Sequence, residues 1–243
     1  MEKRIVLAAD DLTIEQLLAL LKVVGSRLYA VKIHNLYDEH GPRIIEWLKN
    51  YEPKVWVDAK LHDIPATVAK RAAVFKRAGA DILTVHASGD VGMMRAAIEH
   101  GPPEIYAVSI LTSFSEVQAR NIYHRSIGGL VSDLFEFMDR ALVHGVVCSP
   151  QETTLLRQLL SERPLLQRKP DWSPKLVTPG IRSAGKEAND QQRIATPAEA
   201  IRNGSDLLVI GRQITTAPDP LKALEKIERE MAEVLLKKEG VSC

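Results

Sequence analysis

Cysteine, net charge and long apolar runs are all scarce in this chain of 243 residues, and each shortage excludes a class of protein. Two cysteines, Cys148 and Cys243, cannot form the disulfide framework of a small secreted protein. A formal net charge of +1 is far from the broad positive surface of a nucleic-acid binder. No apolar run approaches the roughly 18 residues of a membrane span, and the run after Met1 is too short for a signal peptide. We therefore expect a cytoplasmic protein that binds neither nucleic acid nor membrane.

The chain also has no Pro/Gly/Ser-rich linker that would divide it into parts. With 45% hydrophobic and 26% charged residues, its composition is that of an ordinary globular protein. Barrel proteins commonly use about 250 residues as one domain. We therefore predict a single domain over residues 1–243.

Eight short apolar runs alternate with helical patterns along the chain, which is typical of βαβ repeats and a parallel sheet. The runs are too continuous for half-exposed strands, so the economical interpretation is an α/β fold closed into a (β/α)8 TIM barrel. An open doubly wound sheet is the alternative, but no G-x-G-x-x-G turn follows the first run. The predicted strands are residues 5–9, 28–33, 55–59, 81–85, 105–111, 145–148, 175–178 and 206–210.

Helix-start signals support this alternation. Thr13 with Gln16 and Thr196 with Glu199 have the spacing of a capping box, and prolines stand at two further starts. Helical spacing also recurs within the longest connection, residues 114–144. The predicted helix starts are residues 13–16, 42, 149–152 and 196–199.

Three charged residues stand out in the stretch from Val55 to Thr67, which contains the third predicted strand. Asp58 and Lys60 are two residues apart, so their side chains should project to the same side of a strand, and Asp63 follows in the loop. Carboxylates beside a lysine raise its pKa and favour the ammonium form. Such a lysine is a proton donor rather than a nucleophile, although a purely structural salt-bridge cluster would have the same composition.

Polar residues also end the other predicted strands. These ends form the active-site face of a barrel, so the side chains should converge there. After the last strand, Gly211 permits close backbone approach and Arg212 offers a guanidinium for phosphate, although a solvated arginine beside a glycine turn is the alternative. The polar loop over residues 178–191 would serve as a lid. The polar side chains expected at this face are Asp10, Lys32, Asp58, Lys60, Asp63, Thr112, Arg182, Gln191 and Arg212.

The run from Asp58 to Pro65 closely resembles the D-x-K-x-x-D-I-P motif of the orotidine 5'-phosphate decarboxylase family. Three further segments resemble the same family in the same order, so the resemblance extends from Asp10 to about Pro220. They are Leu111-Thr112-Ser113 at the fifth strand end, Thr178 to Arg182 with Asp190-Gln191 in the phosphate loop, and Ile210-Gly211-Arg212.

The resemblance implies a carboxy-lyase that converts orotidine 5'-phosphate (OMP) to UMP and CO2 without a cofactor or metal. It also implies a homodimer with active sites at the interface, where Asp63 and Thr67 reach into the partner's site. The resemblance implies that Asp58 and Lys60 act at C6, with Lys60 as the proton donor. It implies that Asp10 and Lys32 bind the ribose, that Thr112 contacts the pyrimidine, and that Gln191 and Arg212 bind the phosphate. Ile64 and Gly211 are further implied substrate contacts, and Arg182 belongs to the lid.

Three alternatives remain at this point. Related 3-keto-L-gulonate 6-phosphate decarboxylases and hexulose-phosphate synthases share D-x-K-x-x-D but use a magnesium-bound enediolate. A Schiff-base aldolase would need an unprotonated lysine, and a catalytically silent phosphate-binding barrel would have the same fold. The chain also departs from the family pattern at Ala9, where leucine is common, and at His34, where glycine is usual. Both positions bear on the geometry around Lys32.

Overall fold

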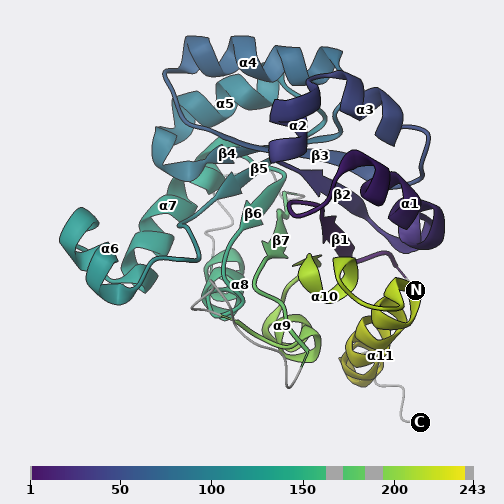
Figure 1. Cartoon of the computed structure of the whole chain (residues 1–243). Coiled ribbons are helices and arrows are strands. Elements are labelled where there is room, and N and C mark those ends of the chain that lie inside the picture. Colours follow the sequence, from purple (N-terminus) through teal and green to yellow (C-terminus); the bar gives the residue numbers. More distant parts are fainter. Residues whose placement is uncertain (1, 163–171, 184–193, 239–243) are drawn as a thin grey trace.

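The eight strands of the chain are parallel and close into a barrel in sequence order, with β1 paired to β8 (Figure 1). This computed structural model describes residues 2–162, 172–183 and 194–238. The closed sheet confirms the predicted (β/α)8 barrel. The strands are β1 (Ile5–Ala8), β2 (Ala30–Ile33), β3 (Lys54–Leu61), β4 (Ile82–His86), β5 (Glu104–Val108), β6 (Gly145–Val147), β7 (Lys175–Thr178) and β8 (Leu207–Ile210).

Helices surround the strands, and one of them, α6, extends away from the barrel (Figure 1). The helices are α1 (Ile14–Val24), α2 (Asn35–His40), α3 (Arg43–Leu48), α4 (Pro65–Arg77), α5 (Asp90–His100), α6 (Glu116–Tyr123), α7 (Ile127–Ala141), α8 (Thr153–Ser161), α9 (Pro197–Asn203), α10 (Arg212–Thr215) and α11 (Pro220–Lys238), with 3-10 turns η1 (Gly25–Arg27) and η2 (Ala87–Gly89).

The capping signals had mixed outcomes. Both capping boxes form, at Thr13 for α1 and at Thr196 for α9. The predicted start at residues 149–152 is wrong, because those residues form a turn and α8 begins at Thr153. The Glu152 carboxylate nevertheless accepts the Ser149 N–H at 3.0 Å. A local hydrogen bond of the capping type can therefore form one turn before the helix itself.

Some short elements were not predicted, namely α2, α6 and α10. Helices of four to eight residues leave little room for a recognisable apolar period. The fifth strand also ends at Val108 rather than Leu111, whose side chain is partly exposed beyond the sheet.

Two apolar cores result from the alternation of side chains along each strand. One lies between the sheet and the helices, and the other fills the barrel interior. In the interior, the Trp56 and Tyr106 rings meet edge to face at 5.2 Å, and the indole N–H of Trp56 donates to Thr84 Oγ1 at 2.5 Å. Trp56 also lines the cavity above this core, so the interior packing forms the floor of the site.

A polar network lies at the opposite, amino-terminal end of the interior. Glu104 accepts hydrogen bonds from Tyr106 at 2.6 Å and from Tyr29, and it forms ion pairs with Lys54 and Lys175. Burial would raise the pKa of Glu104, but the bonds from Lys54 and Tyr106 and the nearby lysine charges lower it to about 2. The barrel is thus filled at this end by a paired charge, and the cavity lies at the other end.

Candidate active site

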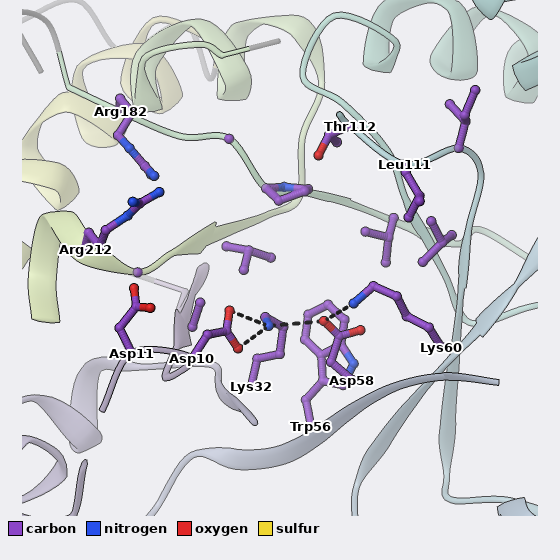
Figure 2. Close-up of a pocket in the computed structure, with 18 residues that line it drawn as sticks. Asp10, Asp11, Lys32, Trp56, Asp58, Lys60, Leu111, Thr112, Arg182 and Arg212 are labelled. Carbon is purple, nitrogen blue, oxygen red and sulfur yellow. Dashed lines mark hydrogen bonds and ion pairs between the residues drawn. The ribbon is translucent and has the colours of Figure 1, made fainter. Parts of the chain in front are cut away.

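A cavity of about 340 Å3 lies at the carboxyl ends of the strands. This is the face at which barrel enzymes carry their active sites. Its lining combines an apolar floor with polar side chains from the strand ends (Figure 2). The polar and charged residues of the lining are Asp10, Asp11, Lys32, Asp58, Lys60, Thr112, Arg182 and Arg212.

Four of these side chains form a row of alternating charge along one side of the cavity (Figure 2). The ammonium group of Lys32, on β2, lies 2.8 Å from an oxygen of Asp10 and 3.1 Å from Asp58 Oδ2. The same Asp58 oxygen accepts from Lys60 Nζ at 2.8 Å. Strands β1, β2 and β3 are neighbours in the sheet, so their ends bring the row together.

Burial and charge oppose each other at the two central members of the row. Burial would lower the pKa of Lys32, but the carboxylates of Asp58 and Asp10 outweigh it and raise that pKa. Burial would likewise raise the pKa of Asp58, but Lys32 and Lys60 together lower it to about 2. Both residues are therefore charged at neutral pH, which makes the row a set of fixed charges.

The pairing of Asp58 with Lys60 was predicted from regular strand alternation, and that reason is wrong. The register between β3 and β4 shifts between Val57 and Leu61, and Lys60 has a left-handed backbone with φ of 44°. Such a backbone is uncommon for a residue with a side chain and is often found at functional sites. An irregular strand end, rather than a regular one, brings the Lys60 ammonium to Asp58.

Two arginines lie across the cavity from Lys60, and their guanidinium groups point toward one another (Figure 2). Arg182 follows β7, is only 9% exposed and donates from Nη1 to the Ile181 carbonyl at 2.7 Å. Arg212 begins α10 directly after Gly211. The cavity therefore has an alternating row of charge on one side and a cationic side opposite.

Between these two sides, the cavity is lined by apolar groups and one hydroxyl. Thr112 and Leu111, in the connection after β5, line it together with Trp56 of the floor. This part of the cavity is therefore mainly apolar, whereas charged side chains line the rest of it.

Some predicted site residues lie elsewhere. Asp63, Ile64 and Thr67 are not among the described residues that line the cavity, and Ile64 is 66% exposed. Asp63 Oδ1 accepts the Ile64 N–H at 2.7 Å and does not contact Lys60 of its own chain. Gln191 lies outside the described residues, as does most of the predicted lid.

Sequence analysis missed other residues at this site. Trp56 precedes Asp58 by two residues, and a strand period of two would have placed both on the inner face. Asp11, Pro179 and Gly180 also line the cavity, next to residues that were predicted. His34 was noted only as a departure from the family pattern, yet its ring nitrogen lies 2.7 Å from the Asp58 carbonyl oxygen.

Among the described residues, no helix combines the length with the apolar composition that a membrane span requires. No group of three or more His, Cys, Asp and Glu side chains in the described parts of the chain could hold a metal ion.

Comparison with known proteins gives one consistent family. The family model described as "Orotidine 5'-phosphate decarboxylase / HUMPS family" matches residues 3–227. The chain is 38% identical to an orotidine 5'-phosphate decarboxylase of Nitrosococcus oceani over 96% of its own length and 100% of that protein.

Solved structures agree in fold. The crystal structure of orotidine 5'-phosphate decarboxylase from Lactobacillus acidophilus is similar with a TM-score of 0.75 and 30% identity, covering 95% of this chain and 99% of that one. An uncharacterized conserved protein from Geobacillus kaustophilus has a TM-score of 0.76 at 29% identity, covering 93% of this chain and 99% of that one.

Proposed function

Because the chain belongs to the orotidine 5'-phosphate decarboxylase / HUMPS family, we propose that it decarboxylates OMP to UMP and CO2 in pyrimidine nucleotide biosynthesis in the cytoplasm. The observation that carries this proposal is the row of alternating charge from Asp10 through Lys32 and Asp58 to Lys60. Such a row supplies a fixed cation beside a fixed anion, which a reaction that develops negative charge on carbon requires.

Loss of CO2 from C6 of OMP leaves an electron pair on a carbon with little resonance stabilisation. Groups that stabilise this charge only as it develops lower the barrier most. The Lys60 ammonium, held at 2.8 Å from Asp58, stabilises the carbanion and then donates a proton to C6. The C–C bond breaks, its electron pair stays on C6, and the proton from Lys60 completes UMP.

Asp58 also orients both lysines of the row in this scheme. Its carboxylate is charged at neutral pH and shared between Lys32 and Lys60, so both ammonium groups are oriented before substrate arrives. Because no group must reorient as the charge develops, the transition state is stabilised without a cost of reorganisation.

The other residues of the site bind the phosphate, the ribose and the pyrimidine of OMP in this proposal. Arg212, with Gly211 and Gln191, binds the phosphate, and Arg182 belongs to the loop that closes over it. Asp10 and Lys32 hold the ribose hydroxyls, and Thr112 lies at the pyrimidine. Phosphate contacts far from C6 then contribute binding energy to closure of the site.

The active form in this proposal is a homodimer with sites at the interface. Asp63, Ile64 and Thr67 are outside the cavity of their own chain and partly or fully exposed, so they are accessible to a second copy. Asp63 and Thr67 of the partner complete each site, and Ile64 contacts substrate. The scheme needs neither metal nor cofactor, because Lys60 supplies both the charge and the proton.

The test is the ultraviolet absorbance of OMP mixed with the purified protein in EDTA. We expect rapid loss of the orotate band with the wild type and a rate at least about 1000-fold lower with Lys60→Ala, because both charge stabilisation and proton donation are lost. Lys22→Ala, an exposed lysine of α1, is the matched control and should keep the wild-type rate.

An unchanged orotate band with the wild type would contradict the proposal. The next substrates would then be 3-keto sugar acid phosphates with and without magnesium, which separate the related decarboxylases from a silent phosphate-binding barrel. A Lys60→Ala variant as active as the wild type would contradict the role of Lys60 alone.

A further inference from the structure

A histidine outside the cavity contacts the main chain of Asp58, whose carboxylate lies at the centre of the charged row. Nδ1 of His34 lies 2.7 Å from the carbonyl oxygen of Asp58. A carbonyl oxygen can only accept, so the ring nitrogen is protonated and donates. His34 is not among the described residues that line the cavity, so its imidazole reaches the site only through Asp58.

This hydrogen bond lies where the regular pairing of β3 ends. The last paired residues of β2 and β3 are Ile33 and Val57, and His34 and Asp58 each follow by one position. On the other side of β3, the register to β4 shifts between Val57 and Leu61. The side chain of His34 thus extends the contact between β2 and β3 by one residue, next to the segment of β3 where the pairing with β4 is irregular.

The segment beyond this point carries the chemistry and has an uncommon backbone. Lys60 has φ of 44°, a conformation that persists in a side-chain-bearing residue only when its surroundings enforce it. Asp58 must present one oxygen to Lys32 at 3.1 Å and to Lys60 at 2.8 Å at the same time. A small shift of the Asp58 main chain would therefore lengthen both ion pairs together.

We infer that His34 is a positioning residue for the decarboxylation, an inference that rests on the proposed function. Its N–H holds the Asp58 carbonyl, and the carboxylate of Asp58 then holds the Lys60 ammonium at the reacting carbon. Misplacement of reacting groups lowers the rate of the chemical step more than it lowers binding. Loss of the imidazole should consequently lower kcat by more than it lowers nucleotide affinity, because Lys60 acts in the chemical step and Lys32 keeps its second partner, Asp10.

The experiment compares kcat and KM for OMP, and UMP affinity by calorimetry, in His34→Ala and His34→Asn. The amide nitrogen of asparagine lies at about the place of Nδ1 and can donate the same bond. We expect His34→Ala to lower kcat about 10-fold with KM and UMP affinity within about twofold, and His34→Asn to recover kcat to within about threefold of the wild type. His100→Ala, an exposed histidine at the end of α5, should match the wild type.

The possible results separate the inference from the proposed function. Wild-type turnover with an unchanged kcat in His34→Ala would overturn the inference alone. Equal kcat values in the alanine and asparagine variants would also overturn it. The same holds for a His34→Ala variant with a lower Tm and an unchanged kcat, because a merely structural role predicts that result. A wild type that leaves OMP unchanged would overturn the proposed function and the inference with it.

Discussion

At the scale of single residues, the charge of Asp58 links stability to pH. Its pKa falls from 3.8 to about 2 in the folded chain, so folding favours the ionised form. The unfolded chain therefore binds the proton more readily, and stability declines as the pH falls through this window. The contribution of Asp58 is fully present above pH 3.8 and lost as the pH approaches 2.

Replacement of Asp58 by asparagine tests this account. At pH 7, Asp58→Asn leaves the buried Lys32 paired with Asp10 alone, and we expect the free energy of unfolding in urea to fall by about 2 kcal/mol. The difference from the wild type should shrink as the pH falls from 4 toward 2, since Asp58 then takes up a proton more readily in the unfolded chain than in the folded one. Asp38→Asn, an exposed carboxylate of α2, should change the free energy of unfolding by less than about 0.5 kcal/mol. A variant as stable as the wild type at pH 7 would contradict the ion-pair argument.

At the scale of elements, the junction of β8 with α10 brings two strands into close contact. A Cβ at Gly211 would lie 3.3 Å from the Ala8 carbonyl oxygen and 3.4 Å from Ala8 Cβ. The two Ala8 atoms leave little room for a side chain, so the close packing of β8 against β1 favours glycine here. The position of Arg212 depends on this close approach of β8 to β1.

Gly211→Ala should therefore weaken nucleotide binding more than folding. The added methyl moves the β8 end from β1 and shifts Arg212, and we expect UMP affinity by calorimetry to fall about 3- to 10-fold with less than about 2 kcal/mol lost from the free energy of unfolding. The control is Gly128→Ala on α7, where a Cβ would meet only Leu155 at 3.9 Å and UMP affinity should stay unchanged. Wild-type affinity in Gly211→Ala would contradict the argument.

At the scale of the whole molecule, the proposed site needs two chains. Lys60 and Asp58 line the cavity of one chain, whereas Asp63 of that chain is exposed outside it. If Asp63 acts in the partner's site, two inactive variants should complement each other. An equal mixture of Lys60→Ala and Asp63→Ala would form about half mixed dimers, each with one intact site, and so about a quarter of wild-type activity.

A second mixture serves as the control for this complementation. Lys60→Ala mixed with Asp58→Asn should give no recovery, because both residues act in the site of their own chain and no mixed dimer has an intact site. No recovery in the first mixture, with subunit exchange verified by mass spectrometry, would contradict the shared site.

Local signals determined most of the fold. The alternation of strands with helices and the capping boxes at Thr13 and Thr196 follow from apolar periodicity and short-range hydrogen bonding, which depend on neighbouring residues. The closed barrel was the economical interpretation of that alternation, and the structure confirms it. The short helices α2, α6 and α10 and the start of α8 did not follow, because packing and turn chemistry decide such elements.

By itself, the sequence determined which residues end each strand, and therefore that Asp10, Lys32, Asp58, Lys60 and Arg212 would meet at one face of a barrel. Only the tertiary structure decided how they meet. His34 and Asp58 are 24 residues apart in the chain, and the register shift in β3 likewise depends on pairing with another strand, β4. Contacts of that kind leave no local periodicity in the sequence, because they form and stabilise the chain only once the barrel has closed.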